Sequence, residues 1–249
     1  MTSPQAPLPT PFTAAATADD VLAGATVTVA SRDTERAAAV VGGIDGVRVE
    51  QLDLTDPASI DDFADRWNAS GRALPMLVNN AAVLFQGERR VDARGHELAF
   101  STSHLGHFQL TRALLPALRA AGGARVLTVT SGAARFGRIR WDDVDFTTEY
   151  DPGAAYGQSK RANTLFTVEL DRRYAAEGIR AFAAHPGVVI GPGPHRADRV
   201  ASYRAQGLVD ERGATISTRP RARRPSSRVR RPSSSVRPVL CSTASAACI

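Results

Sequence analysis

The stretch Tyr150–Phe166, YDPGAAYGQSKRANTLF, decides how this chain is interpreted, and Tyr156 and Lys160 stand at its centre. Residues four apart on a helix lie on one face, one turn apart, so this phenol and ammonium can meet in one small volume. A tyrosine with its ordinary pKa of about 10 is a poor acid or base at neutral pH, whereas a neighbouring cation favours the phenolate. The spacing therefore indicates a proton-transfer pair.

Lys160 is the only lysine among the 249 residues, and the other thirty basic residues are arginine. A compact ammonium thus stands at one position in a chain that otherwise uses the planar guanidinium. Taken alone, a Tyr-x-x-x-Lys motif is also compatible with an ordinary solvated pair on a surface helix. The neighbouring sequence is needed to decide between the two interpretations.

The segment Ala124–Thr130, ARVLTVT, predicts a buried strand with Ser131 at its carboxyl end, 25 residues before Tyr156. Open α/β sheets bind their ligands at the carboxyl ends of strands. The strand ending in Ser, followed by Tyr-x-x-x-Lys, resembles the short-chain dehydrogenase/reductase family. The 25-residue spacing, with RIRWDD between, is most similar to its retinol-dehydrogenase-like subgroup. The resemblance implies that Tyr156 is the general acid/base, that Lys160 lowers its pKa and holds the nicotinamide ribose, and that Ser131 orients the carbonyl or alcohol.

Alternating strand and helix patterns predict an α/β fold, a Rossmann-type doubly wound parallel sheet. The expected strands are 25–30, 47–52, 75–78, 124–130 and 179–185, and the expected helices are 13–22, 34–41, 57–67, 95–119 and one around Tyr156 that ends near Ala176. The expected organisation is a flexible proline-containing lead (1–20), a truncated dehydrogenase domain (21–213) and a disordered Arg/Pro/Ser-rich tail (214–249).

Several segments after the strands resemble the cofactor-binding segments of the family. Arg32 resembles the residue that selects a 2′-phosphate, since a guanidinium binds phosphate in a bidentate manner, and this favours NADP over NAD; a solvated arginine at a strand end is the alternative. The remaining expected cofactor contacts, beyond Tyr156 and Lys160, are Asp53 and Leu54 beside the adenine, Asn80 and Ala81 in Asn-Asn-Ala-Ala, and Pro186 and Val189 near the carboxamide.

Three departures from the family pattern are apparent. The glycine-rich turn that receives a pyrophosphate at a helix N-terminus is missing, as if the first strand, its turn and its helix had been cut out at Leu22–Ala25. We therefore expect an incomplete sheet, with a hole where that strand would lie. Ser103 stands where the family usually has the Asn that holds a relay water. After Gly213 the tail replaces the expected final helix and strand.

Composition limits the functional classes. The net charge is +6, but the tail from Arg219 carries eight arginines and no acidic residue, so the first 218 residues carry −2. Nucleic-acid binding is therefore not expected of the folded part. Both cysteines, Cys241 and Cys248, lie in the tail, and His104 and His107 lack further ligands at suitable spacing, so neither a disulfide nor a metal is expected. No apolar run predicts a membrane span or signal peptide, which favours a cytoplasmic protein.

These observations leave three hypotheses. The first is an NADP(H)-dependent oxidoreductase that interconverts an alcohol and a ketone or aldehyde. The second is a catalytically impaired relative that has lost cofactor binding. The third is a binding protein that acts through its basic tail, although translation in a shifted frame would also produce such a tail. The resemblance also implies a possible homodimer, formed through the helices around His104 and Tyr156.

Overall fold

The computed structural model describes residues 26–83, 87–187 and 196–205. Its five strands pair in parallel and form two separate sheets among these residues, one of order β1-β2 and one of order β3-β4-β5. The Rossmann-type α/β fold is thus confirmed, and so is the expectation that the sheet is incomplete. The strands are β1 (Val27–Ser31), β2 (Val47–Gln51), β3 (Met76–Asn79), β4 (Ala124–Val129) and β5 (Ile179–Ala184).

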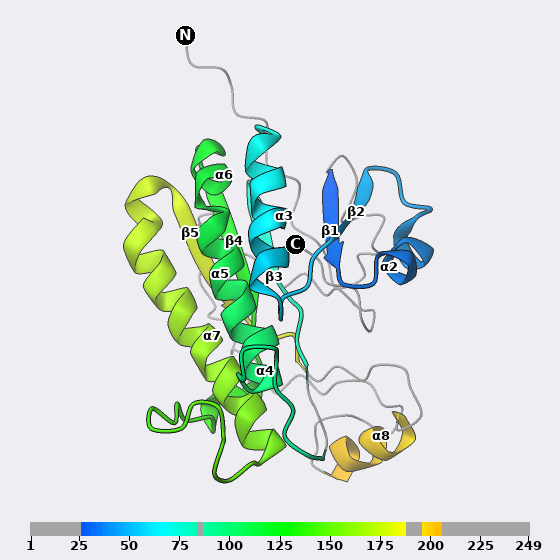
Figure 1. The fold of residues 1–249 in the computed structure, drawn as a ribbon, viewed down its shortest axis with the longest axis vertical. Helices are drawn as coiled ribbons and strands as arrows, with labels where there is room; N and C mark the ends of the chain where they lie inside the picture. Colours follow the sequence, from blue (N-terminus) through cyan, green and yellow to red (C-terminus); the bar gives the residue numbers. More distant parts are fainter. Residues whose placement is uncertain (1–25, 84–86, 188–195, 206–249) are drawn as a thin grey trace, which may run out of the picture. The chain divides into compact units, whose positions relative to one another are not determined.

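Helices lie along one face of the three-stranded sheet (Figure 1). Leu77 of β3, Val126 of β4 and Ile179 of β5 are each fully buried and belong to one core cluster with residues of these helices, such as Phe63 and Leu118. Parallel sheets are normally buried beneath helices, and all three strands here contribute to one such core. The helices concerned are α3 (Pro57–Ala69), α5 (Gly106–Ala113), α6 (Leu115–Ala120) and α7 (Pro152–Tyr174).

The two-stranded sheet carries a small core of its own. Val29 of β1 and Ala37 of α2 (Thr34–Val41) are buried together, with partly buried valines of both strands packed against them. Ala30, on the opposite side of β1 from Val29, belongs instead to the main core with Leu52 and Leu54. No strand pairs the two sheets within the described residues, so β1 and β3 each lie at an edge of their sheet, as do β2 and β5. This separation is where the missing first strand was expected.

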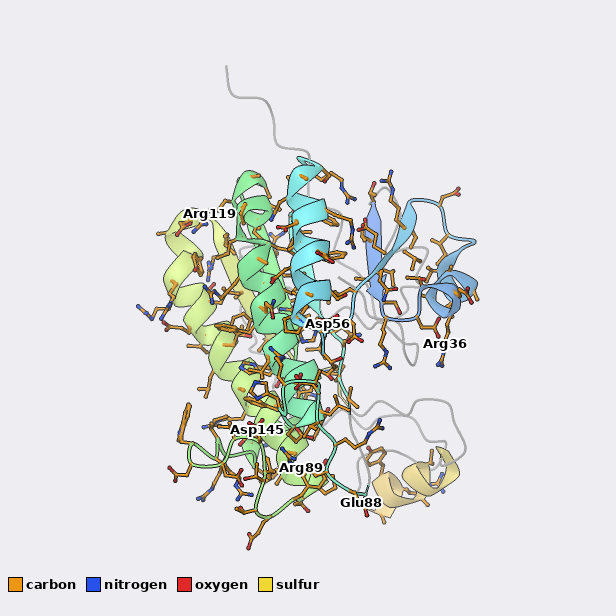
Figure 2. The ribbon with its side chains drawn as sticks, in the orientation of Figure 1. Arg36, Asp56, Glu88, Arg89, Arg119 and Asp145 are labelled. Carbon is orange, nitrogen blue, oxygen red and sulfur yellow. The ribbon has the colours of Figure 1, made fainter. Side chains whose placement is uncertain are left out.

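Aspartates cap the starts of three helices. Asp33, Asp56 and Asp151 precede α2, α3 and α7, and each accepts a hydrogen bond from a backbone amide of the first turn. Such a cap satisfies one of the four free amides at a helix N-terminus. Pro57 and Pro152 follow two of these caps at the first helical position, where a missing N–H costs nothing. Figure 2 shows Asp56 at the start of α3.

The long helix predicted over 95–119 is interrupted. Helical structure begins only at α4 (Leu98–Phe100), continues as a π-helical turn at Ser101–Leu105, and breaks again at Leu114 between α5 and α6. Pro116 explains the second break, because proline donates no hydrogen bond and its ring clashes with the carbonyl four residues earlier. The other predicted elements within the described residues are present, and their ends agree with the predictions within two residues.

Several predictions lie outside the described residues. The helix expected over 13–22, the lead, the tail from residue 214 and Val189 are among them. The helix α8 (Arg196–Ala205) belongs to a different unit of the chain from residues 26–187 and is considered by itself. Its ten residues include three arginines and one aspartate, which is a composition typical of an exposed helix.

Candidate active site

Three predicted site segments follow neighbouring parallel strands. Asn80 comes directly after β3, Ser131 lies two residues after β4, and Pro186 lies two residues after β5. A Cβ placed on Gly132 would lie 3.4 Å from His185 Nε2, so the segments that follow β4 and β5 are in contact. The structure therefore brings these residues to one edge of the sheet, where α/β folds bind ligands.

Lys160 is buried on α7, with 1% of its surface exposed. Its Nζ donates a 2.9 Å hydrogen bond to the carbonyl oxygen of Val129 at the end of β4, and lies 5.7 Å from the centre of the Tyr156 ring. Thr130 Oγ1 donates a 3.1 Å hydrogen bond to the Lys160 carbonyl. The strand end and the helix are thus joined at the lysine, and the ammonium lies near the phenol, as the four-residue spacing predicted.

Burial lowers the pKa of Lys160 from 10.5 to about 8. The cause is desolvation, which penalises the charged form of an ammonium. The lysine therefore exchanges its proton near physiological pH, whereas an exposed lysine does not. Perturbed pKa values of this kind are enriched at functional sites, although they occur in structural networks as well.

The turn that carries Ser131 packs tightly on α7. Ser131 caps the 3₁₀ turn Gly132–Arg135, and its Oγ accepts a 3.2 Å hydrogen bond from the amide of Ala133. A Cβ on Gly157 would lie 3.3 Å from the Ala133 carbonyl oxygen, and one on Gly137 would overlap the Gly157 carbonyl. The backbones of the turn and the helix approach so closely that only glycine fits at Gly137. This contact places the Ser131 segment beside the helix that carries Tyr156.

Ser103, expected at the position of the relay asparagine, lies in the π-helical turn and is fully buried. Its Oγ accepts a 3.2 Å hydrogen bond from the amide of Val83, the residue that follows Asn-Asn-Ala-Ala. Asn79 in that motif donates from Nδ2 to Thr111 Oγ1 at 3.0 Å. The hydroxyl of Ser103 thus fixes the loop after β3 to the π-helical turn.

Asn163, which no local pattern in the sequence predicted, connects α7 to the π-helical turn. Its Nδ2 donates a 2.9 Å hydrogen bond to the Ser103 carbonyl, and its Oδ1 lies 3.0 Å from His104 Nδ1. His107 Nδ1 lies 3.0 Å from the same carbonyl. Burial lowers the pKa of His107 to about 4, so this imidazole is neutral at pH 7. The prediction that both histidines pack within the fold agrees with their environment, but the asparagine gave no signal because its partners lie about 60 residues away.

Gln158 is a second buried polar residue that was not predicted. Its Oε1 accepts from the Arg140 amide at 2.8 Å, and its Nε2 donates to the Val144 carbonyl at 2.7 Å. The loop between the Ser131 turn and α7 is therefore attached to the helix directly beside Tyr156. Its position between Tyr156 and Lys160 in the Tyr-x-x-x-Lys motif was the one sequence signal that it lies near the site.

The residues predicted at the adenosine end follow β1 and β2. Arg32 is exposed directly after β1, and its carbonyl accepts from Gln51 Nε2 at 3.2 Å. Asp53 accepts hydrogen bonds at Oδ1 from the amide and hydroxyl of Thr55, at 2.9 and 2.7 Å, and so shapes the turn into α3. Leu54 is buried in the main core. Arg32 is thus the one of these side chains that is exposed to solvent.

A dinucleotide would find suitable groups at its two ends but no pyrophosphate cradle among the described residues. Such a cradle needs a glycine turn that leads from a strand end into a helix N-terminus. Glycines with positive φ at 46, 122 and 178 precede strands, and Gly71 follows α3, so they lie at the wrong edge. Gly87 and Gly95 lie between β3 and the three-residue helix α4, away from the strand end, and Gly187, at φ 84°, follows β5. The described residues also contain no group of three His, Cys, Asp or Glu side chains that could hold a metal.

Comparison with known proteins is consistent with this geometry. Residues 14–192 match the family model described as short chain dehydrogenase. The chain is 41% identical over 198 residues to a "Probable oxidoreductase" of Streptomyces antibioticus, which covers 77% of this chain and 65% of that protein. It is 40% identical over 173 residues to retinol dehydrogenase 12 of Mus musculus, which covers 67% and 54%. The chain thus spans about half to two thirds of the length of these relatives.

Among solved structures, an uncharacterized protein from Mycobacterium Paratuberculosis is similar at 42% identity with a TM-score of 0.59, over 65% of this chain and 59% of that one. A short-chain dehydrogenase from Streptomyces avermitilis is similar at 25% identity and a TM-score of 0.54, over 76% and 72%. In the part of the chain that the structure describes, no helix is both long and apolar enough to cross a bilayer.

Proposed function

Because the chain belongs to the short-chain dehydrogenase family and is related to oxidoreductases, we propose that it interconverts an alcohol and a ketone or aldehyde with NADP(H). The observation that supports this most is the buried Lys160, hydrogen-bonded to the end of β4 and 5.7 Å from the Tyr156 ring. Burying an ammonium group costs free energy, and a role in proton transfer explains why one is buried here.

In the proposed reaction Tyr156 exchanges a proton with the substrate oxygen. Lys160 stabilises the phenolate by its charge, and the pKa of about 8 allows it to pass a proton on near neutral pH. Ser131 would hold the substrate oxygen by a hydrogen bond from its hydroxyl, which accepts from the Ala133 amide and still has its own hydrogen to donate. The nicotinamide, when bound, would supply or accept the hydride.

Arg32 is the residue that favours NADP over NAD in this proposal. It is exposed at the end of β1, and no described acidic side chain forms an ion pair with it. A free guanidinium at this edge can accept a 2′-phosphate in two parallel hydrogen bonds. Asn80, Ala81 and Pro186 would contact the nicotinamide half from the ends of β3 and β5.

The separation of the two sheets favours a second candidate, a relative with impaired catalysis that has lost cofactor binding. β1 and β3 are edge strands among the described residues, and no cradle for a pyrophosphate lies between them. The same Tyr156–Lys160 pair would then persist without a cofactor. The proposed location is cytoplasmic and the proposed partner is a small alcohol or carbonyl compound.

Titration with NADPH, followed by nicotinamide fluorescence, separates the two candidates. Saturable binding that weakens in Arg32→Ser but not in the matched variant Arg36→Ser supports the oxidoreductase, since Arg36 is an exposed arginine one turn away on α2. Failure to saturate at millimolar NADPH, with the fold intact by circular dichroism, would reject the active enzyme in favour of the impaired relative. A carbonyl-dependent loss of absorbance at 340 nm then tests turnover.

A further inference from the structure

The carbonyl oxygen of Ser103 accepts hydrogen bonds from two side chains. Asn163 Nδ2 donates from α7 at 2.9 Å. His107 Nδ1 lies 3.0 Å from the same oxygen, on α5, four residues after Ser103. A carbonyl oxygen has two lone pairs, so it can accept hydrogen bonds from both donors at once. Ser103, Asn163 and His107 are each at least 97% buried, which shields the arrangement from water.

The donors and acceptors in this cluster can be ordered without ambiguity. A carbonyl only accepts, so Asn163 must direct its NH₂ toward Ser103 and its Oδ1 toward His104, and both histidines must carry their hydrogen on Nδ1. His104 therefore donates to Asn163, and Asn163 donates to Ser103. The π-helical turn, a feature that often marks functional sites, is thereby held against α7.

Asn163 lies three residues after Lys160, so the two side chains are neighbours on one face of α7. Burial is the main cause of the lowered pKa of His107, and the positive charge of Lys160 lowers it further. We propose, building on the function proposed above, that Asn163 is a positioning residue: by occupying the Ser103 carbonyl together with His107, it leaves Lys160 directed at Val129 and Tyr156.

Loss of the Asn163 amide frees one lone pair of the Ser103 carbonyl, whose donor on α7 lies one turn from Lys160. The ammonium, or a water bound to it, would then gain an acceptor in addition to Val129. Extra hydrogen bonds to a charged group favour the charged form, so the pKa of Lys160 would rise from about 8 toward 10.5. The Tyr156 phenol would in turn lose the alignment with the lysine that proton transfer needs.

The single lysine makes this directly measurable. Protein labelled with ¹⁵N at lysine Nζ gives one side-chain signal, which belongs to Lys160, and its titration needs no cofactor. We expect Asn163→Ala and Asn163→Leu to raise the pKa by about one unit, a tenfold change in acidity. The leucine variant leaves no cavity, so an effect common to both variants comes from the lost hydrogen bond. Thr167→Val is the matched control, since Thr167 is buried on the same face and donates to the Asn163 carbonyl.

An unchanged lysine pKa in both folded Asn163 variants would overturn the proposal, and so would an equal rise in Thr167→Val. If the variants do not fold, long-range ¹⁵N spectra of the wild-type histidines still decide, because a hydrogen on Nε2 of neutral His104 or His107 contradicts the ordered cluster. Since both readouts are made without NADPH, a protein that binds no cofactor leaves this test intact.

Discussion

A methyl group at Gly137 should separate the Ser131 turn from the Tyr156 helix. The Cβ of Gly137→Ala would lie 2.9 Å from the amide nitrogen of Gln158 and overlap the Gly157 carbonyl, both on α7. Ordinary contacts of a Cβ lie at about 3.4–4 Å, so the turn and the helix must move apart by roughly 1 Å. Overpacking of this kind costs about 1–3 kcal/mol.

The expected result is a fall in melting temperature of about 2–12 °C, because 1 kcal/mol corresponds to about 2–4 °C in a domain of this size. Where the enzyme is active, a displacement of about 1 Å between Ser131 and Tyr156 should lower kcat/KM by up to about 10²-fold. Differential scanning fluorimetry measures the first effect and reductase kinetics the second.

Gly123→Ala and Gly157→Ala are the matched controls. Nothing lies within 4 Å of a Cβ at Gly123, so this variant should be neutral. At Gly157 the nearest atoms lie 3.3 Å away, a mild contact that the higher helix propensity of alanine offsets by up to about 1 kcal/mol. The reasoning is refuted if Gly137→Ala melts at the temperature of Gly123→Ala.

Three further predictions follow from described contacts. Lys160→Met should stabilise the protein at pH 7 by roughly 2 kcal/mol, which is about 3 from the lowered lysine pKa less about 1 for the hydrogen bond to Val129. Because the folded pKa of about 8 lies below the unfolded value, the cost of burying the charge is full below pH 8 and fades toward pH 10.5. The difference in urea stability between variant and wild type should therefore be smaller at pH 10 than at pH 7, and an equal difference at both would contradict this. Gly106→Ala should destabilise by about 1–3 kcal/mol, because its Cβ would lie 2.8 Å from Leu54 Cβ, and an unaltered urea midpoint would show that α5 can shift freely. Arg32→Glu should reverse the preference for NADPH over NADH in fluorescence titrations, and an unchanged preference would assign the 2′-phosphate to another residue.

The strands and most helix ends could be predicted because their signals are local. β-branched apolar runs such as ATVTVA indicate buried strands, and aspartates before Thr34 and Pro57 mark helix starts. The absence of a glycine-rich turn likewise predicted a sheet in two parts. The breaks in 95–119 were not predicted, because the apolar periodicity continues across them and conceals the effect of Pro116.

The site could be predicted only where its residues belong to one short motif. Tyr156 and Lys160 are one helical turn apart, and their proximity follows from spacing. Asn163 and Gln158 act through contacts with residues far along the chain, which no local pattern encodes. That Lys160 is buried, and not solvated, also depends on packing against β4.

The small core of β1, β2 and α2 implies uneven resistance to local opening. Val29 and Ala37 are its only fully buried apolar members in the described residues, whereas the three-stranded sheet belongs to a far larger cluster. Segments with few buried contacts open at free energies below that of global unfolding. Amide hydrogens of Val27 and Val29 should therefore exchange with deuterium well before those of Val126 and Leu127. The two-stranded sheet that precedes Arg32 would open locally while the three-stranded sheet beside Lys160 stays folded.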